Sequence, residues 1–279
     1  MKFIFALRSY GDFVILINSL TACNEKDKFT IIASLHLKPL YDALKDSINL
    51  NGINIVFYDF KIKNGLFNLF SNKYLFSIST LVQLKLYNKA INDLIKSDSN
   101  ELIVEKENRA WLLQLFTKIK LNYIVKYNAN VYESFSRFFK VNMDNYNASS
   151  LTKNDHVVIL PIARLKKRNF PANLVNELVD KIKKLDLNYS IFSFNKNIYP
   201  NDSIYDNFTS IIHIVKNSNF VICADSLQAH ICFLFKKAHF IYIPKNGKTD
   251  FLTPFALSQN YYSTFDKLNH KFLDTYNVN

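Results

Sequence analysis

A short polar segment near the start of the sequence, Arg8-Ser9-Tyr10-Gly11-Asp12, carries residue types that can do chemistry. It follows an apolar, β-prone stretch and precedes a helical-looking one, so we expect it at the carboxyl end of a strand. An aspartate there can act as a general base that takes the proton from an attacking hydroxyl group. In the alternative, structural interpretation, Asp12 is the N-cap of the helix and Gly11 is a turn residue. A role as N-cap and a role as base are compatible.

A second segment, at 163–171, is strongly basic and lies between a predicted strand and a helix that starts at Pro171. Its four cationic side chains are Arg164, Lys166, Lys167 and Arg168. Cations just before a helix N-terminus favour phosphate binding, because their charges add to the unpaired amides of the first helical turn. The alternative is a solvated basic turn.

A third segment, at 224–230, again leads from a predicted strand into a predicted helix. Asp225 and Ser226 stand at the expected cap, and His230 follows about a turn later. Cap amides, a hydroxyl and an imidazole can together hold a diphosphate. The alternative is an ordinary capped helix with a buried histidine.

Strands and helices alternate in the predicted order on both sides of the middle of the chain. In the first half we expect strands at 2–7, 29–34, 53–58, 101–104 and 122–125, and helices at 13–20, 38–45, 66–96 and 109–120. In the second half we expect strands at 157–161, 189–194, 220–224 and 240–244, and helices at 172–184, 210–217 and 227–235. This alternation predicts parallel sheets whose ligands sit at the carboxyl ends of the strands.

The length and composition indicate two globular domains. A chain of 279 residues suits two α/β units, and the polar stretch at 142–154 predicts the linker between domains at 1–145 and 155–279. Hydrophobic residues make up 49%, but no apolar run approaches 20 residues, so we expect a soluble protein without a membrane-spanning helix. The net charge of +12 predicts attraction to an acidic partner.

Several other patterns are interpreted as structural. Gly247-Lys248-Thr249 lacks the earlier glycine of a phosphate-binding P-loop, because position 242 is a tyrosine. The histidines at 36, 156, 213, 239 and 270 show no metal-ligand spacing, so no metal is expected. The three cysteines, Cys23, Cys223 and Cys232, are expected to be buried thiols in a reducing cytosol. A lipoprotein leader ending at Cys23 is disfavoured, because charged residues interrupt its apolar region.

The three polar segments, in this order, resemble those of glycosyltransferase family 9, the heptosyltransferase-like enzymes of the GT-B fold. Residues 9–12 match the Ser-x-Gly-Asp-type loop, which puts Asp12 in the position regarded as the catalytic base. Residues 167–171 match a Lys-Arg-Trp-Pro-like sequence whose lysine, here Lys167, is held to contact donor phosphates. Residues 225–230 match the Asp-Ser/Thr-Gly-x-x-His motif around the donor diphosphate, with Leu227 in place of the glycine.

The resemblance implies an α/β protein of two Rossmann-like domains, with parallel sheets facing across a cleft. It implies that the N-terminal domain binds a glycan acceptor, with Asp12 as the base, and that the C-terminal domain binds a nucleotide sugar. The implied donor-binding residues are Lys167, Arg168, Asp225, Ser226 and His230, and Arg8, Ser9 and Gly11 are implied to contact the acceptor or a phosphate. Direct displacement would invert the sugar without a metal, and a helix at 266–276 is expected to pack back across the cleft.

The expected partners are therefore a nucleotide sugar and a glycan or glycolipid acceptor of the bacterial surface, such as lipopolysaccharide core, O-antigen or capsule. We expect a cytoplasmic protein that contacts the anionic inner face of the inner membrane peripherally. Two alternatives stay open. The positive charge also suits a nucleic-acid-binding protein, although no recognised motif for one appears and nucleic acid is not an expected partner. The chain also suits a catalytically degenerate GT-B domain, because Leu227 can crowd a phosphate that a glycine admits.

Overall fold

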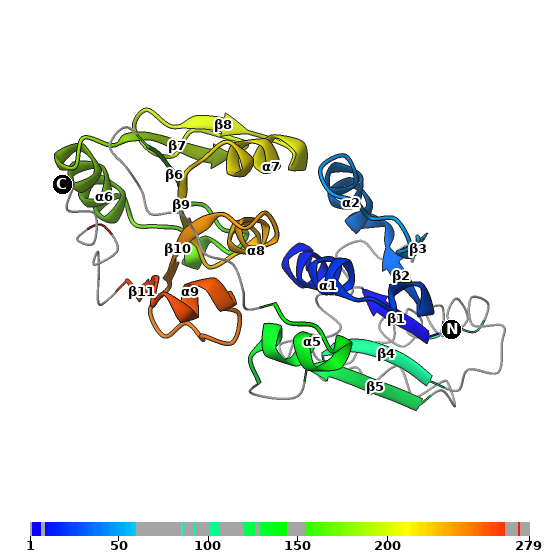
Figure 1. The fold of residues 1–279 in the computed structure, drawn as a ribbon. Helices are drawn as coiled ribbons and strands as arrows, with labels where there is room; N and C mark the ends of the chain where they lie inside the picture. Colours follow the sequence, from blue (N-terminus) through cyan, green and yellow to red (C-terminus); the bar gives the residue numbers. More distant parts are fainter. Residues whose placement is uncertain are drawn as a thin grey trace. The chain divides into compact units, whose positions relative to one another are not determined.

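The chain folds into two compact units, each built on a parallel β-sheet. The computed structural model describes residues 2–6, 9–59, 101–106, 120–125, 129–143 and 155–265, together with Lys85, Asn92 and Leu273. The units comprise Met1–Val141 and Asn142–Asn279. Figure 1 shows the helices and strands of each unit. Most of the expected linker at 142–154 lies outside the described residues, as does the expected helix at 266–276 apart from Leu273.

The first unit has a five-stranded sheet in the order β3-β2-β1-β4-β5, and every neighbouring pair is parallel. Its described elements are β1 (Lys2–Ala6), α1 (Tyr10–Ala22), η1 (Lys26–Lys28), β2 (Phe29–Ser34), η2 (Leu35–Leu37), α2 (Lys38–Lys45), β3 (Asn54–Tyr58), β4 (Glu101–Lys106), β5 (Lys120–Val125) and α5 (Val131–Phe139). The chain runs from β1 outward to β3 and then returns to place β4 on the other side of β1. The boundary between β1 and β4 is therefore the topological switch point of this sheet.

The start of α1 differs from the sequence-based expectation. The helix begins at Tyr10 rather than at residue 13, because Ser9 adopts an extended conformation and its hydroxyl accepts a hydrogen bond from the Asp12 amide. Gly11 and Asp12 therefore lie in the first helical turn, and the prediction of Asp12 as N-cap and Gly11 as a turn residue is wrong. The helices expected at 66–96 and 109–120 lie outside the described residues, apart from Lys85, Asn92 and Lys120, which begins β5.

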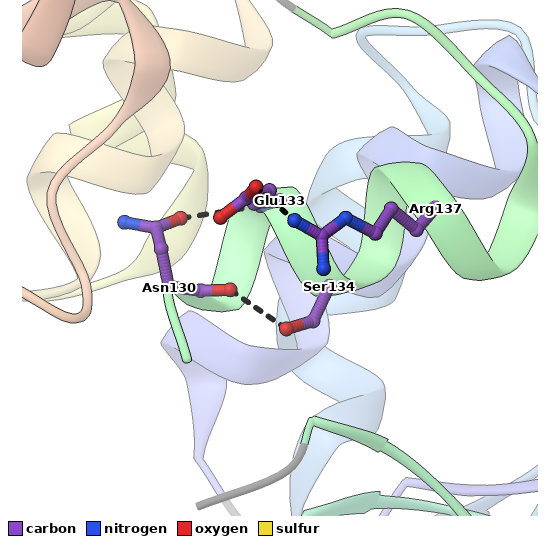
Figure 2. A network of polar contacts seen from close by, with 4 residues as sticks. All are labelled: Asn130, Glu133, Ser134 and Arg137. Atoms are coloured by element: carbon purple, nitrogen blue, oxygen red, sulfur yellow. Dashed lines mark hydrogen bonds and ion pairs between the residues drawn. The ribbon is translucent and has the colours of Figure 1, made fainter. Parts of the chain in front are cut away.

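Helix α5 was not expected from the sequence. Asn130 caps it, because the Asn130 side-chain oxygen accepts a hydrogen bond from the Glu133 amide at 3.2 Å. Figure 2 shows this cap together with the Ser134 hydroxyl, which donates to the Asn130 carbonyl at 2.8 Å, and the ion pair between Arg137 and Glu133. An Asn-x-x-Glu spacing is close to a capping box, so a local signal for this helix was present in the sequence.

The second unit has a six-stranded sheet in the order β11-β10-β9-β6-β7-β8, again parallel throughout. Its described elements are β6 (His156–Leu160), η4 (Lys166–Arg168), α6 (Ala172–Lys184), β7 (Asn188–Phe194), β8 (Ser203–Tyr205), α7 (Phe208–Lys216), β9 (Phe220–Ala224), α8 (Leu227–Leu234), β10 (Ala238–Ile243), α9 (Pro254–Ser258) and β11 (Tyr262–Thr264). The chain moves from β6 to β8 on one side and then places β9 on the other side of β6. The switch point of this sheet lies between β6 and β9.

The burial of the central strands explains why the elements of this unit could be predicted from sequence patterns. Every residue of β9 and of β10 is buried, and the same holds for β2 in the first unit. Strands of a parallel sheet that are covered on both faces are typically continuous apolar runs. β9 is one, and in β2 and β10 only Thr30, Ser34 and His239 interrupt the apolar sequence. The strands and helices expected in the second half are present, whereas the short elements β8, α9 and β11 were missed.

The prediction of buried thiols is confirmed, since Cys23, Cys223 and Cys232 are all free and buried. Across the described ranges, the longest apolar helices are too short to cross a membrane.

Candidate functional site

In the first unit, Ser9 and Asp12 form a compact polar pair directly after β1. The Ser9 hydroxyl accepts a hydrogen bond from the Asp12 amide at 3.0 Å and donates one to Asp12 Oδ2 at 2.7 Å. Asp12 is buried, with 7% of its surface exposed, and Gly11 beside it is half-buried. The pair fixes the Asp12 carboxylate in the first turn of α1, at the switch point of the sheet. Arg8, the remaining residue expected at this edge, lies outside the described residues.

The neighbouring strand β2 contributes a second polar group to the same edge. His36 Nδ1 lies 2.8 Å from the Ser34 hydroxyl, and the Tyr10 ring packs edge-on against the His36 imidazole with 5.6 Å between ring centroids. Since β1 and β2 are parallel neighbours, both segments leave the sheet at the same end. His36 is exposed, and the sequence patterns did not point to it because it has no metal-ligand spacing.

In the second unit, the basic loop after β6 has a defined shape. The Phe170 amide donates to the Pro161 carbonyl at 2.9 Å, and the Ala163 amide donates to the Asn169 side-chain oxygen at the same distance. These two bonds close the loop, and three of its cations, Lys166, Lys167 and Arg168, form the short turn η4. Lys167 is exposed there, and it forms no ion pair within the described part of the chain.

A second contact supports this loop from the side. The Tyr199 hydroxyl donates to the Phe170 carbonyl at 2.6 Å, and burial raises the pKa of Tyr199 to about 12. The turn that carries Tyr199 is itself closed by Asp202, whose Oδ2 accepts hydrogen bonds from the Ile198 and Tyr199 amides at 2.9 and 3.1 Å. The chain between β7 and β8 thus braces the end of the basic loop.

Arg168 joins the basic loop to the turn after β9. Its Nη1 lies 3.0 Å from Asp225 Oδ2 and donates to the Asp225 backbone carbonyl, also at 3.0 Å. The Asp225 side chain is 8% exposed and that of Arg168 is 32% exposed, so the Arg168 side chain stays partly open to solvent. The pair therefore spans β6 and β9, at the switch point where ligands of open α/β sheets bind.

The electrostatics of Asp225 reflect both its burial and its partner. Burial raises the pKa of the Asp225 carboxyl above its ordinary value, and the nearby Arg168 guanidinium opposes this effect without cancelling it. Burial therefore costs the carboxylate part of its solvation free energy, and the positive charge of Arg168 offsets part of that loss.

The N-terminus of α8 follows directly after Asp225. Ser226 occupies the N-cap position, but its side chain caps no amide of the helix. Its hydroxyl donates instead to the Gln228 side-chain oxygen, while Gln228 Nε2 donates to the Ile162 carbonyl and to the Tyr205 hydroxyl, both at 2.9 Å. Leu227, the first residue of α8, is half-buried and has no positive φ, so its backbone conformation does not require a glycine.

The structure brings some of the expected residues together and leaves others apart. Arg168 contacts Asp225, which directly precedes Ser226, and Ser9 contacts Asp12. His230 is buried within α8. Sequence reasoning missed Gln228 and Tyr205. The available signal for Gln228 was an amide in a helix whose other residues, His230 aside, are apolar. Nothing local distinguishes Tyr205.

The described residues contain no group of three histidine, cysteine or carboxylate side chains arranged to hold a metal ion.

Comparison with solved structures finds proteins of the same fold. The structure of E. coli heptosyltransferase WaaC with ADP-2-deoxy-2-fluoro heptose is similar at a TM-score of 0.54 and 10% identity, over 93% of this chain and 98% of that one. The chain has the GT-B fold of the heptosyltransferases. A second similar structure is the glycosyl transferase family 9 protein from Veillonella parvula DSM 2008, at a TM-score of 0.56 and 12% identity over 95% of this chain and 85% of that one.

A third heptosyltransferase-like match is E. coli ADP-heptose lps heptosyltransferase II, at a TM-score of 0.55 and 11% identity over 97% of this chain and 91% of that one. The sequence itself matches no protein-family model, and no curated protein sequence matches it significantly. The fold that the sequence resemblance implied is confirmed, with two Rossmann-like parallel sheets. The roles of individual residues remain predictions.

Proposed function

We propose that this protein is an inverting glycosyltransferase that moves a sugar, heptose or a similar one, from a nucleotide-sugar donor to a bacterial surface glycan. The observation that carries the proposal is the Arg168–Asp225 pair, which bridges β6 and β9 beside the N-terminus of α8. This is the switch point of a doubly wound sheet, in a chain with the heptosyltransferase fold. Fold alone does not imply activity, so the chemistry of these residues has to support it.

The proposed donor site suits a nucleoside diphosphate. Lys167 and the partly exposed Arg168 supply positive charge, and the first-turn amides of α8 supply hydrogen-bond donors with the positive end of the helix dipole. These groups would stabilise the charge that develops on the diphosphate as the sugar leaves, and Ser226 and His230 complete the proposed set. Two of the similar structures are named for complexes with ADP-2-deoxy-2-fluoro heptose and with ADP, which makes ADP-heptose the first donor to test.

The proposed acceptor site lies in the first unit, where Asp12 would act as the general base. The Ser9 hydroxyl holds the carboxylate through Oδ2, which orients it without neutralising it. A carboxylate within reach of the acceptor hydroxyl would take its proton as the new glycosidic bond forms, and direct displacement inverts the anomeric carbon. Arg8, Ser9 and Gly11 are the residues proposed to contact the acceptor or its phosphates.

The proposed acceptor is a glycan or glycolipid such as lipopolysaccharide core, O-antigen or capsule. A net charge of +12 supports binding to phosphorylated acceptors held at the anionic inner face of the membrane. We therefore propose a cytoplasmic protein with peripheral membrane contact, which needs no metal for transfer.

A thermal-shift screen tests the donor site directly, because a ligand that binds the native state raises its unfolding temperature. The purified protein is heated with ADP, UDP, GDP and dTDP, with ADP-heptose and other nucleotide sugars, and separately with short DNA and RNA. We expect one nucleoside diphosphate and its sugar conjugate to raise the unfolding temperature selectively. Stabilisation by nucleic acid, with none by any nucleotide, would overturn the proposal.

A further inference from the structure

Gln228 occupies an unusual place at the start of α8. It is the second residue of the helix, and only 7% of its surface is exposed. Its amide group contacts three segments that are far apart in the sequence: the loop after β6 through the Ile162 carbonyl, β8 through the Tyr205 hydroxyl, and the cap of α8 through the Ser226 hydroxyl. A buried side-chain amide with its donors and acceptor engaged has one defined orientation.

This orientation determines what the Ser226 hydroxyl can do. A serine at an N-cap normally turns its oxygen toward the amides of the second or third helical residue and accepts a hydrogen bond from one of them. Ser226 makes no such bond, because its hydroxyl is directed at the Gln228 side-chain oxygen, with the Ala224 carbonyl as a second acceptor at 3.3 Å. The first turn of α8 therefore keeps amides that no side chain caps, next to Arg168 and Asp225.

We propose that Gln228 is a positioning residue, which holds the Ser226 hydroxyl away from the α8 amides so that a diphosphate can bind them. The proposal rests on the proposed function, since it concerns the same donor site. Gln228 does not touch the donor in this scheme and acts only through Ser226. Tyr205 and the Ile162 carbonyl act one step further back, because they fix which way the Gln228 amide faces.

The scheme predicts a specific result for Gln228→Met, which keeps the side-chain volume and removes the amide. Ser226 is then released to cap α8 and competes with the diphosphate for the same amides. We expect the dissociation constant for ADP and for inorganic pyrophosphate, measured by titration calorimetry, to rise about tenfold, as the loss of one or two hydrogen bonds would give.

A double-mutant cycle separates positioning from general destabilisation. In a Ser226→Ala background there is no hydroxyl to cap the helix, so adding Gln228→Met should change the affinity for ADP by less than about twofold. Thr253→Val serves as the stability control. It removes a buried hydroxyl that bonds His239 Nε2 at 2.7 Å, away from the donor site, and should lower the unfolding temperature without changing ADP affinity.

Tyr205→Phe provides a milder test if Gln228→Met folds poorly. It removes one contact of the Gln228 amide and should weaken ADP binding by about two- to threefold, again only when Ser226 is present.

The outcomes are distinguishable. A wild-type protein that binds neither a nucleoside diphosphate nor pyrophosphate overturns the proposed function, and this inference with it. Wild-type binding that Gln228→Met and Tyr205→Phe leave unchanged overturns the inference alone, as does an equal loss with and without Ser226.

Discussion

Arg168 and Asp225 stand 57 positions apart in the sequence, and one guanidinium nitrogen of Arg168 lies 3.0 Å from both the carboxylate and the backbone carbonyl of Asp225. The double contact fixes the guanidinium relative to the turn after β9 as well as to its charge partner. A cation held in this way can meet a phosphate without first losing the rotational freedom of a long side chain.

Asp225→Asn should separate the stability of the fold from binding of the donor. Because the pKa of Asp225 is raised in the folded protein, chiefly by burial, its ionised form is disfavoured there relative to the unfolded chain. The neutral amide avoids that cost, so we expect equal or higher thermal stability at pH 7. Without the ion pair Arg168 is held less firmly, and ADP affinity should fall about five- to tenfold.

Two measurements check this expectation. The wild-type unfolding free energy should rise relative to that of Asp225→Asn as the pH falls from neutral through the raised pKa toward the ordinary value of 3.8, because the folded state takes up the proton first. Calorimetric titration with ADP gives the affinity. A variant that is strongly destabilised at pH 7 and binds ADP as well as the wild type would show that Asp225 has only a structural role.

Lys167→Ala should weaken diphosphate binding without affecting folding. Lys167 is exposed in η4, so its removal leaves no buried group unsatisfied, whereas a lost contact to phosphate should raise the dissociation constant for ADP about tenfold. The loss should shrink at high salt, because exposed charges are screened.

Lys184→Ala is the matched control for this variant. Lys184 is also exposed, but it ends α6 and therefore lies at the opposite edge of the sheet. The same change in ADP affinity in both variants would indicate a general effect of net charge rather than a phosphate contact.

Asp12→Asn should abolish most of the transfer while leaving the donor site intact. The amide keeps the size of the carboxylate and its contact with Ser9 but cannot accept the acceptor's proton, so the rate should fall about 10²- to 10⁴-fold. Single-turnover transfer from ADP-heptose to truncated lipopolysaccharide cores measures the rate, and ADP affinity should not change. The control is Asp42→Asn, which alters an exposed carboxylate paired with Lys38 in the same unit. Full activity of Asp12→Asn would exclude the base role.

His239 should make the second unit sensitive to acid. It is completely buried, and burial lowers its pKa from 6.5 to about 4, while its ring bonds the Lys237 carbonyl and the Thr253 hydroxyl. The unfolded chain takes up a proton at a higher pH than the folded one does. Stability is therefore fully present above about pH 6.5 and is lost as the pH falls toward 4, by up to about 3 kcal/mol.

Urea unfolding at several pH values checks this effect. Between pH 6.5 and 4, His239→Phe should lose stability less steeply than the wild type, although it starts from a lower value because two polar partners are left unsatisfied. His213→Gln, which alters an exposed histidine of α7, should keep the wild-type slope. Parallel slopes for the wild type and His239→Phe would contradict the prediction.

The alternation of strands and helices could be predicted from the sequence alone, and it implied the parallel sheets. The heptosyltransferase-like fold followed from the resemblance of three short motifs. A buried strand such as β9 is a continuous apolar run with a polar turn after it, and such a pattern is local. The same local signals marked the turns that hold Asp12, Lys167 and Asp225, because ligands of this fold bind where strands end.

Other features became visible only in the tertiary structure. The three-residue strands β8 and β11 are too short to show a period, and they form because β7 and β10 supply hydrogen-bonding edges beside them. The helix α1 starts earlier than its apolar pattern, because the Ser9 cap sets its first turn.

The contacts of the candidate donor site were also decided by the tertiary structure. The order of strands in the sheet brings the end of β6 next to the end of β9. Arg168 can therefore donate a hydrogen bond to Asp225, and Gln228 can donate one to the Ile162 carbonyl. A hydrogen bond between residues so far apart depends on which strands become neighbours. Periodicity within a segment carries no information about that choice, which is why the polar residues were predictable and their partners were not.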